Sequence, residues 1–231
     1  MPRDNLSFIL VRPRNPGNIG SAARVMANFG FSDLRVVSPH PPIWDEALKL
    51  AADSKSLVRK AKVFATLREA LDDRSRVYGT TALTGRVRKS EIRSLPKFRP
   101  VCASAVVFGP ENNGLSESDL QFCDELLNIP TNTDRPSLNL AQSVAIVCYE
   151  LGARRKTAQT YKTSRELLPS RGIERLVSEI EAALLKLRYR PSMSPSARRE
   201  KVRRLLRRRG VAKTEGGFLS EVLRRVSEAP L

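Results

Sequence analysis

The sequence predicts an α/β domain with a mostly parallel sheet, followed by a small all-helical domain. Two observations favour this division. Apolar runs of strand length alternate with helical segments up to about residue 155, which is the pattern of βαβ units. Beyond residue 170 the apolar residues recur at three- and four-residue spacing, which is typical of amphipathic helices. We therefore expect a first domain at 1–155, a linker at 156–170 and a basic helical domain at 171–231.

The first βαβ unit is predicted at the start of the chain. Residues 6–11, LSFILV, have the length and composition of a buried strand, and the turn residues RPRNPGN follow. Residues 19–31 space their apolar side chains like one face of a helix, with Gly30 suited to its end. The apolar run 34–39 then predicts a strand parallel to the first.

The alternation continues through the rest of the first domain. Ser116 and Asp119 have the spacing of a capping box, which predicts where one of the helices begins. Ser137, Asn139 and Gln142 are uncharged hydrogen-bonding residues at the start of the last, apolar helix. The expected segments are a helix at 44–61, a strand and helix at 63–72, strands at 75–82 and 103–109, a helix at 116–124, a strand at 125–130 and a helix from 138.

Three short helices are predicted for the helical domain. Apolar residues from Ile173 to Leu187 define the first, and residues 217–229 define the third. The middle helix, 194–210, has Ser194 as a cap, Pro195 in its first turn and Gly210 at its end.

The charge of the chain is strongly basic and unevenly distributed. Its formal net charge is +17 and its sequence pI is about 10.6. Residues 1–151 hold 20 Lys and Arg against 16 Asp and Glu, whereas 152–231 hold 21 against 8. Such a balance favours a nucleic acid or an anionic membrane as partner, the alternative being a merely soluble basic protein.

Several classes of protein are disfavoured by composition. Cys102, Cys123 and Cys148 are widely spaced and His40 is the single histidine, so we expect neither a zinc site nor a disulfide framework, and no metal. No apolar stretch approaches the roughly 20 residues of a membrane span. The apolar run near the N-terminus is too short for a signal peptide, so we expect a cytoplasmic protein without membrane contact.

Familiar catalytic and nucleotide motifs are missing. Neither GxGxxG nor GxxxxGK[ST] occurs, and Gly17 with Gly20 is only a weak sign of a phosphate-binding turn. Serine–histidine chemistry would depend on His40, which lies in a PHPP loop. Glu117 and Asp119, the carboxylates nearest to Glu111, suit helix capping and solvation better than paired-carboxylate hydrolysis.

Four polar loops nevertheless follow predicted strands, where ligands of α/β proteins usually bind. They are RPRNPGNIGSAAR (12–24), GTTALTG (79–85), FGPENNG (108–114) and NIPTNTDRPSLN (128–139). The segments NPGNIGSAAR, FGPENNGLS and IPTNTDRPSLNLAQSVAIVCYEL closely resemble, in this order, the three signature motifs of the SPOUT superfamily of RNA methyltransferases. The resemblance covers about residues 6–152 and is strongest to the TrmH/TrmJ branch, whose TrmJ-like tRNA enzymes carry a similar C-terminal extension.

This resemblance implies a fold, a cofactor and an assembly. The C-terminal part of the sheet would be threaded into a deep trefoil knot, a rare exception to the usual topology rules. S-adenosyl-L-methionine would be the cofactor, and the protein would be a homodimer whose sites are completed across the subunit interface. The reaction implied is methylation of a ribose 2′-hydroxyl of RNA.

The resemblance also implies site residues, carried over by position. Asn18 matches the asparagine that holds the geometry of the first motif. Ser137 also suits a helix N-cap. The expected catalytic residues are Arg24, Glu111, Ser137 and Asn139. The expected cofactor-binding residues are Thr80, Thr81, Ala82, Gly109, Ile129, Ser137, Leu138 and Asn139.

For the chemistry, Arg24 is a poor general base because a guanidinium barely deprotonates. We expect it to position the hydroxyl and stabilise the developing alkoxide, with a substrate phosphate taking the proton. A phosphate anchor without a role in the chemical step is the alternative. Asn112 and Asn113 replace an acidic residue and an arginine common in the family, and Arg135 replaces an aromatic residue. Both departures lie near the substrate side and bear on target specificity more than on cofactor binding.

RNA is the expected partner, since the 2′-hydroxyl distinguishes it from DNA and the run RREKVRRLLRRR suits phosphates. The expected RNA-binding residues are Arg12, Arg14, Asn18, Arg135, Arg203, Arg204, Arg207 and Arg208. The expected target is a pyrimidine at position 32 of a tRNA anticodon loop. Alternatives are another tRNA or ribosomal RNA nucleotide, a non-catalytic RNA-binding protein of the same fold, and a small-molecule nucleotide enzyme, which the basic tail disfavours.

Overall fold

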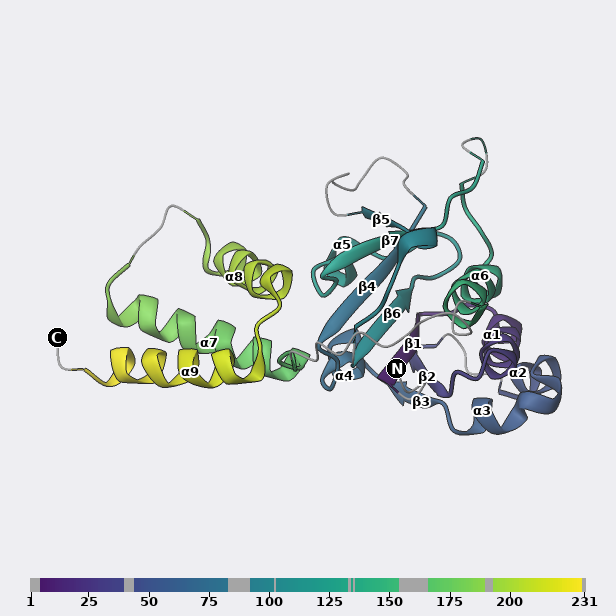
Figure 1. The fold of residues 1–231 in the computed structure, drawn as a ribbon, viewed down its shortest axis with the longest axis horizontal. Coiled ribbons are helices and arrows are strands. Elements are labelled where there is room, and N and C mark those ends of the chain that lie inside the picture. The colour runs from purple at the N-terminus through teal and green to yellow at the C-terminus, as the bar shows by residue number, and fades with distance from the viewer. Residues whose placement is uncertain are drawn as a thin grey trace.

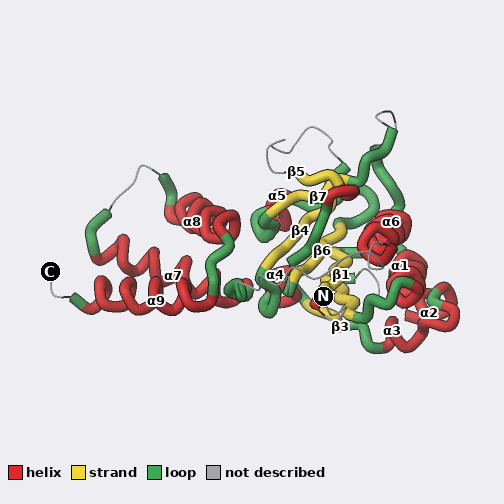
Figure 2. Tube along the Cα trace, viewed as in Figure 1, coloured by secondary structure: helices red, strands yellow, loops and turns green. Residues whose placement is uncertain are grey.

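The structure, a computed structural model, places a helix-covered sheet beside a group of helices (Figures 1 and 2). The residues it describes are 5–39, 44–82, 92–101, 103–132, 134, 136–153, 166–189 and 193–229. Among them, every helix is too short or too polar to span a lipid bilayer. His40, Cys102, Arg135 and most of the expected linker lie outside the described residues.

In the part of the chain that the structure describes, seven strands form one sheet in the order β3-β2-β1-β6-β4-β7-β5, and each neighbouring pair is parallel. This confirms the predicted parallel sheet. The strands are β1 (Leu6–Val11), β2 (Asp33–Val37), β3 (Lys62–Phe64), β4 (Arg76–Thr81), β5 (Ile92–Ser94), β6 (Ser104–Phe108) and β7 (Glu125–Asn128). Only β5 was not predicted, because its three residues contain no apolar run.

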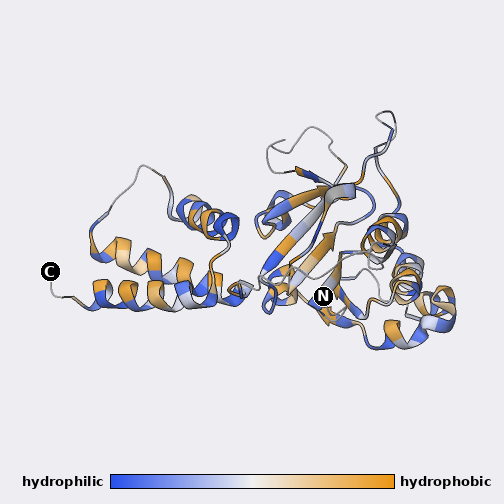
Figure 3. Cartoon of the chain, in the orientation of Figure 1, coloured by the Kyte–Doolittle hydropathy of each residue, from blue (hydrophilic) through white to orange (hydrophobic). Residues whose placement is uncertain are grey.

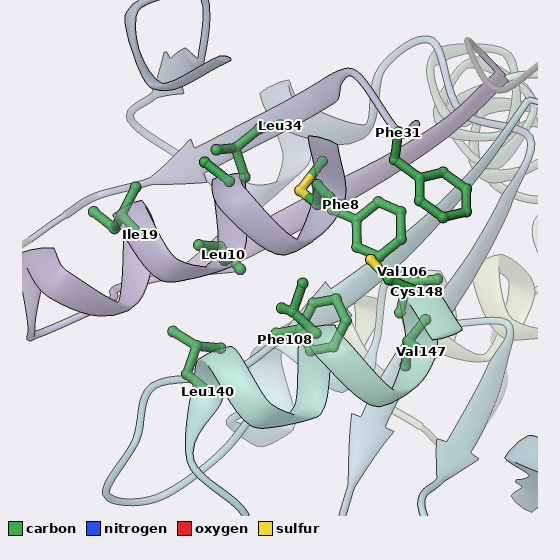
Figure 4. Close-up of a cluster of buried hydrophobic side chains, with 14 of the residues drawn as sticks. Phe8, Leu10, Ile19, Phe31, Leu34, Val106, Phe108, Leu140, Val147 and Cys148 are labelled. Atoms are coloured by element: carbon green, nitrogen blue, oxygen red, sulfur yellow. The ribbon is translucent and has the colours of Figure 1, made fainter. Parts of the chain in front are cut away.

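One face of the sheet carries the larger core. Phe8, Leu10 and Phe108 point from the strands toward the helices, and Val147 and Cys148 meet them from the last helix of the domain (Figure 4). The helical segments of the domain that contribute buried side chains to this core are α1 (Pro16–Asn28), α2 (Trp44–Leu50), α3 (Lys55–Arg59), α6 (Leu140–Ala153) and the 3-10 turn η4 (Leu95–Lys97). The predicted helix 44–61 is interrupted by the 3-10 turn η2 (Ala52–Ser54).

The opposite face of the sheet has a smaller core. Ile9 and Val11 alternate with Phe8 and Leu10 along β1, so this strand is buried on both faces, as parallel strands usually are. The two helices that follow β3 and β6 are α4 (Leu67–Leu71), which packs on this face, and α5 (Glu117–Leu120). Ser116 and Asp119 form the predicted capping box at the start of α5.

Helix α1 begins earlier than its apolar spacing predicts. The Asn15 side chain accepts a hydrogen bond from the backbone of Gly17, and Pro16 occupies the first position of the helix. Gly20 is required for packing, because a Cβ atom there would lie 2.1 Å from the carbonyl oxygen of Ala47 in α2. Gly20 therefore serves the close packing of α1 against α2.

The helical unit comprises residues 166–189 and 193–229. Its helices are α7 (Ser170–Lys186), α8 (Pro195–Arg209) and α9 (Lys213–Glu228). The Ser194 cap, the Pro195 start and the left-handed Gly210 end of α8 are confirmed. Leu168 packs into this unit, so the residues just before α7 belong to it and not to a linker. Much of α8 is blue in Figure 3, in keeping with its many arginines.

Candidate active site

Three neighbouring strands in the sheet, β6, β4 and β7, end at the same edge. Their pairing is parallel, so the loops after Phe108, Thr81 and Asn128 all leave from the carboxyl edge of the sheet. The loop after β1 leaves from this edge too, because β1 pairs with β6 in parallel. The four loops that the sequence singled out therefore begin at one edge.

Gly109 allows the loop after β6 to turn back tightly. A Cβ atom at this position would lie 2.3 Å from the backbone of both Gly114 and Leu115, so no other residue fits without a shift of the main chain. The turn brings Glu111 next to the segment that precedes α1. A glycine directly after an apolar strand was the sequence signal for this turn.

Glu111 joins the loop after β6 to the loop after β1. Its Oε1 atom accepts a hydrogen bond of 2.6 Å from the Asn18 side chain, and the backbone N–H groups of Arg14 and Asn15 donate to the carboxylate at 3.1 and 3.3 Å. Burial works to raise the pKa of Glu111, but these hydrogen bonds outweigh it and hold the pKa below its ordinary value. The carboxylate is therefore ionised and occupied as an acceptor.

Asn139 extends this connection to the loop after β7. Its Nδ2 atom donates to the Oδ1 atom of Asn18 at 3.1 Å. Its Oδ1 atom accepts from the backbone of Ala141 at 2.8 Å, while Gln142 accepts from the Asn139 backbone at 3.2 Å. Asn139, and not Ser137, thus caps α6, and the polar entry to this apolar helix is explained by capping combined with a contact to the first loop.

The end of β4 is held by its two neighbours in the sheet. The Thr80 hydroxyl donates to the carbonyl oxygen of Val107 in β6 at 3.1 Å, and the Asn128 side chain donates to the carbonyl of Thr81 at 3.1 Å. These contacts fix the three carboxyl ends relative to one another. Asn128 was not among the predicted site residues, although an asparagine at the end of an apolar strand is a usable signal.

The remaining residues expected to bind the cofactor differ in burial. Ile129 is buried, Ala82, Gly109 and Leu138 are half-buried, and Leu138 packs against the main core. Ser137 is exposed. The edge thus offers backbone and uncharged side chains beside the Glu111 cluster, which consists of Asn18, Glu111 and Asn139.

Arg12 connects β1 to α5. It has a left-handed backbone with a φ of 46°, and its guanidinium pairs with the carboxylate of Asp119, including a bond of 3.1 Å from Nη1. Burial works to raise the pKa of Asp119, but the hydrogen bonds from Arg12 and Ser116 hold it below its ordinary value. Arg12 and Arg14, both expected to bind RNA, therefore differ from each other: Arg12 is engaged with Asp119, whereas the Arg14 side chain is exposed.

Arg24 is separate from the Glu111 cluster. It lies on the exposed surface of α1, six residues after Asn18, which corresponds to about 9 Å along the helix axis. It forms no hydrogen bond or ion pair with the described residues of this chain. The structure therefore brings Glu111 and Asn139 together with Asn18 but does not bring Arg24 to them.

The arginines of α8 fall into two groups. Arg203 donates to Glu174 at 2.6 and 3.0 Å and lies over the ring of Phe122, and Arg207 is only 3% exposed. Arg204, which pairs with Glu200, and Arg208 are exposed. The RNA contacts predicted for Arg203 and Arg207 thus fall on one guanidinium group that is engaged with Glu174 and on another that is buried, its Nε and Nη2 atoms lacking hydrogen-bond partners among the described residues.

No cluster of three or more histidine, cysteine or carboxylate side chains suited to a metal ion occurs in the described part of the chain. Cys123 and Cys148 are both free thiols, and Cys148 is buried.

The chain resembles known proteins over most of its length. A sequence model of the SpoU rRNA Methylase family matches residues 5–149. The Pseudomonas aeruginosa protein named tRNA (cytidine/uridine/adenosine-2'-O-)-methyltransferase TrmJ is 31% identical over 238 residues, 95% of this chain and 93% of the relative. The Methanocaldococcus jannaschii protein named tRNA (cytidine-2'-O-)-methyltransferase TrmJ is 37% identical over 153 residues, 63% of this chain and 66% of that relative. The crystal structure of TrmJ from Z. mobilis ZM4 superposes with a TM-score of 0.80 at 30% identity, covering 96% of this chain and 99% of that one.

Proposed function

Because the chain belongs to the SpoU rRNA Methylase family, we propose that it transfers a methyl group from S-adenosyl-L-methionine to a ribose 2′-hydroxyl of tRNA. The observation that carries this proposal is the Glu111 cluster, which joins three strand-end loops at one edge of the sheet. The names of the bacterial and archaeal relatives, both tRNA 2′-O-methyltransferases, support the reaction and the substrate class.

The carboxyl edge of the sheet fits the cofactor. An adenine ring and a sulfonium need apolar contacts and backbone hydrogen-bonding groups rather than a charged pocket. Ala82, Gly109, Ile129 and Leu138 are uncharged and at least half-buried there. When bound, S-adenosyl-L-methionine supplies an electrophilic methyl group. The proposed contacts are Thr80, Thr81, Ala82, Gly109, Ile129, Ser137, Leu138 and Asn139.

The protein's own part in the reaction is alignment. Glu111 and Asn18 hold the loops, and the low pKa of Glu111 suits a hydrogen-bond acceptor better than a proton acceptor. Arg24 keeps its charge, so it positions the ribose hydroxyl and stabilises the developing alkoxide. A phosphate oxygen of the RNA takes the proton. Positioning of this kind can lower a barrier by about 7–11 kcal/mol.

A homodimer reconciles the exposed position of Arg24 with this role. On α6, Tyr149 is 62% exposed and Ile146 36% exposed, and Tyr149 contacts Phe29 at the end of α1. We propose that this apolar face of α1 and α6 pairs with a second copy and that Arg24 serves the partner's site. We also propose that the C-terminal part of the sheet is threaded into the deep trefoil knot that the resemblance implies.

The proposed target is a pyrimidine at position 32 of the tRNA anticodon loop. Another tRNA nucleotide, or a ribosomal RNA nucleotide as the family name suggests, is the second candidate. The changes at Asn112 and Asn113 lie in the exposed turn after Glu111, so they affect the RNA side of the site more than the cofactor side.

The decisive experiment is methylation of total RNA with labelled cofactor, followed by mass-spectrometric mapping of the methylated nucleotide. We expect label on the ribose 2′-oxygen of tRNA. An Arg24→Ala variant should lose at least about 100-fold in rate, since a charge stabiliser of a transition state is worth that much, with cofactor affinity unchanged. Wild-type protein that binds tRNA but transfers no label would identify a non-catalytic RNA-binding protein.

A further inference from the structure

The helical unit is attached to the opposite edge of the sheet from the candidate active site. The backbone and hydroxyl of Ser170 donate to the carbonyl of Arg74 at 2.7 and 2.8 Å, and the backbone of Arg171 donates to Asp72 at 3.2 Å. Ser75 donates to Leu167 at 3.2 Å. These contacts precede β4, so the unit adjoins the amino end of that strand, as Figure 1 shows.

A group of charged residues lies at the centre of this attachment. The Arg207 Nη1 atom faces the Asp124 Oδ2 atom at 3.9 Å, and both side chains are almost fully buried. Arg76, the first residue of β4, donates to the carbonyl oxygen of Arg207 at 2.6 Å and pairs with Glu125 at 2.7 Å. We call Arg76, Asp124, Glu125 and Arg207 the docking cluster.

A buried ion pair of this kind fixes how the helical unit sits against the sheet more than it adds to the free energy of folding. Taking both charges from water costs free energy, and a pair 3.9 Å apart, with Arg207 Nε and Nη2 and Asp124 Oδ1 lacking hydrogen-bond partners among the described residues, returns only part of it. Removing one partner leaves the other buried without compensation. Burial raises the pKa of the Asp124 carboxyl to about 6 although Arg207 and Arg76 act to lower it, so this carboxylate depends on its cations. The Asp124 Oδ2 atom also accepts a hydrogen bond of 2.6 Å from the Val77 backbone, which an asparagine can retain.

We propose that Arg207 is a positioning residue that holds the helical unit at the amino edge of the sheet. In this position the exposed basic surface of the helical unit contacts RNA remote from the methylated ribose. The exposed cations of α8 are Lys201, Arg204, Arg208 and Arg209. From Arg76 to Thr81, β4 spans about 16 Å, so the docked unit is separated from the strand-end loops by the length of the strand. This inference rests on the proposed function for the identity of the RNA.

The test uses the full chain and three variants, Arg207→Met, Asp124→Asn and the double variant. Small-angle scattering measures the radius of gyration, and calorimetry measures cofactor affinity. Fluorescence anisotropy measures affinity for a full-length tRNA and for its isolated anticodon stem-loop. None of these readouts requires methyl transfer, so a protein without activity would refute the proposed function while leaving the positioning role testable.

Arg207→Met should enlarge the radius of gyration and weaken full-length tRNA binding about tenfold, because a detached unit loses its preorganised second contact. Stem-loop and cofactor affinities should stay unchanged. Asp124→Asn should also weaken docking, because it leaves Arg207 buried without a carboxylate, and the double variant should return toward wild type, because neither charge then remains buried alone. If Arg207→Met does not fold, Arg207→Lys should show the same loss in smaller measure. Unchanged scattering and tRNA affinity, or a double variant as impaired as Arg207→Met, would overturn the proposal.

Discussion

Glu111 shows how one side chain can organise a site without taking part in proton transfer. Its carboxylate accepts hydrogen bonds from Asn18 and from the backbone of two residues before α1. A carboxylate that gains donors on folding becomes a weaker base, and the pKa of Glu111 is accordingly lowered. Its position after Gly109 lets it connect loops that are about 100 residues apart in sequence.

A Glu111→Gln variant tests this role. Glutamine retains one oxygen acceptor but loses the charge, so we expect a loss of about 1 kcal/mol in unfolding free energy at pH 7 and weaker cofactor binding. Because the folded pKa of Glu111 lies below its unfolded value, its stabilisation is complete above the unfolded value and disappears as pH falls through the folded one. Urea unfolding of both proteins should therefore differ at pH 7 and converge at low pH. A difference that persists in acid would contradict the electrostatic explanation.

The two faces of helix α8 differ in their contacts. Arg203 and Arg207, four residues apart, point toward acids and an aromatic ring, whereas Lys201, Arg204 and Arg208 recur at three- and four-residue spacing on the exposed side. A run of arginines that looks uniform in sequence thus contains both docking and solvent-facing residues. The partners of the inward face, Glu174 and Asp124, lie far away in sequence.

The exposed face of α8 predicts the salt dependence of RNA binding. Replacing Lys201 and Arg208 together by alanine should weaken tRNA binding about tenfold and reduce the slope of log affinity against log salt by about 1 per residue. The matched control is Lys55→Ala with Arg59→Ala, which removes the same charge from exposed positions of α3. Filter-binding titrations at several salt concentrations measure both. An equal loss in the control would mean that bulk charge, not this face, attracts the RNA.

Local signals predicted local structure well, and contacts between distant segments could not be predicted. The caps of α8 and the capping box of α5 follow from residues a few positions apart. Strand β5 is ordered only by pairing with β7, and the contact of Arg12 with Asp119 spans 107 residues, so neither has a local signal. The Glu111 cluster was anticipated through family motifs, whereas the burial of Arg207 depends on how the helical unit meets the sheet.

At the scale of the whole molecule, the position of Arg24 requires explanation. It lies on an exposed face of α1, away from the Glu111 cluster, and the same helix ends at Phe29, which contacts the exposed Tyr149 of α6. If a second copy covers the apolar face of α1 and α6, each site combines Asn139 of one subunit with Arg24 of the other. Symmetric dimers of this kind have two equivalent sites.

Mixing two inactive variants tests the arrangement directly. Arg24→Ala and Asn139→Ala homodimers should each be inactive, because every site lacks one residue. After unfolding and refolding together, half of the dimers should be mixed, and each mixed dimer should contain one intact site, so activity should return to about a quarter of wild type. Methyl transfer to tRNA measures the recovery, and the unmixed variants refolded separately are the control. No recovery, with mixed dimers demonstrated by mass spectrometry, would place Arg24 and Asn139 of the same subunit in one site and remove the need for a shared one.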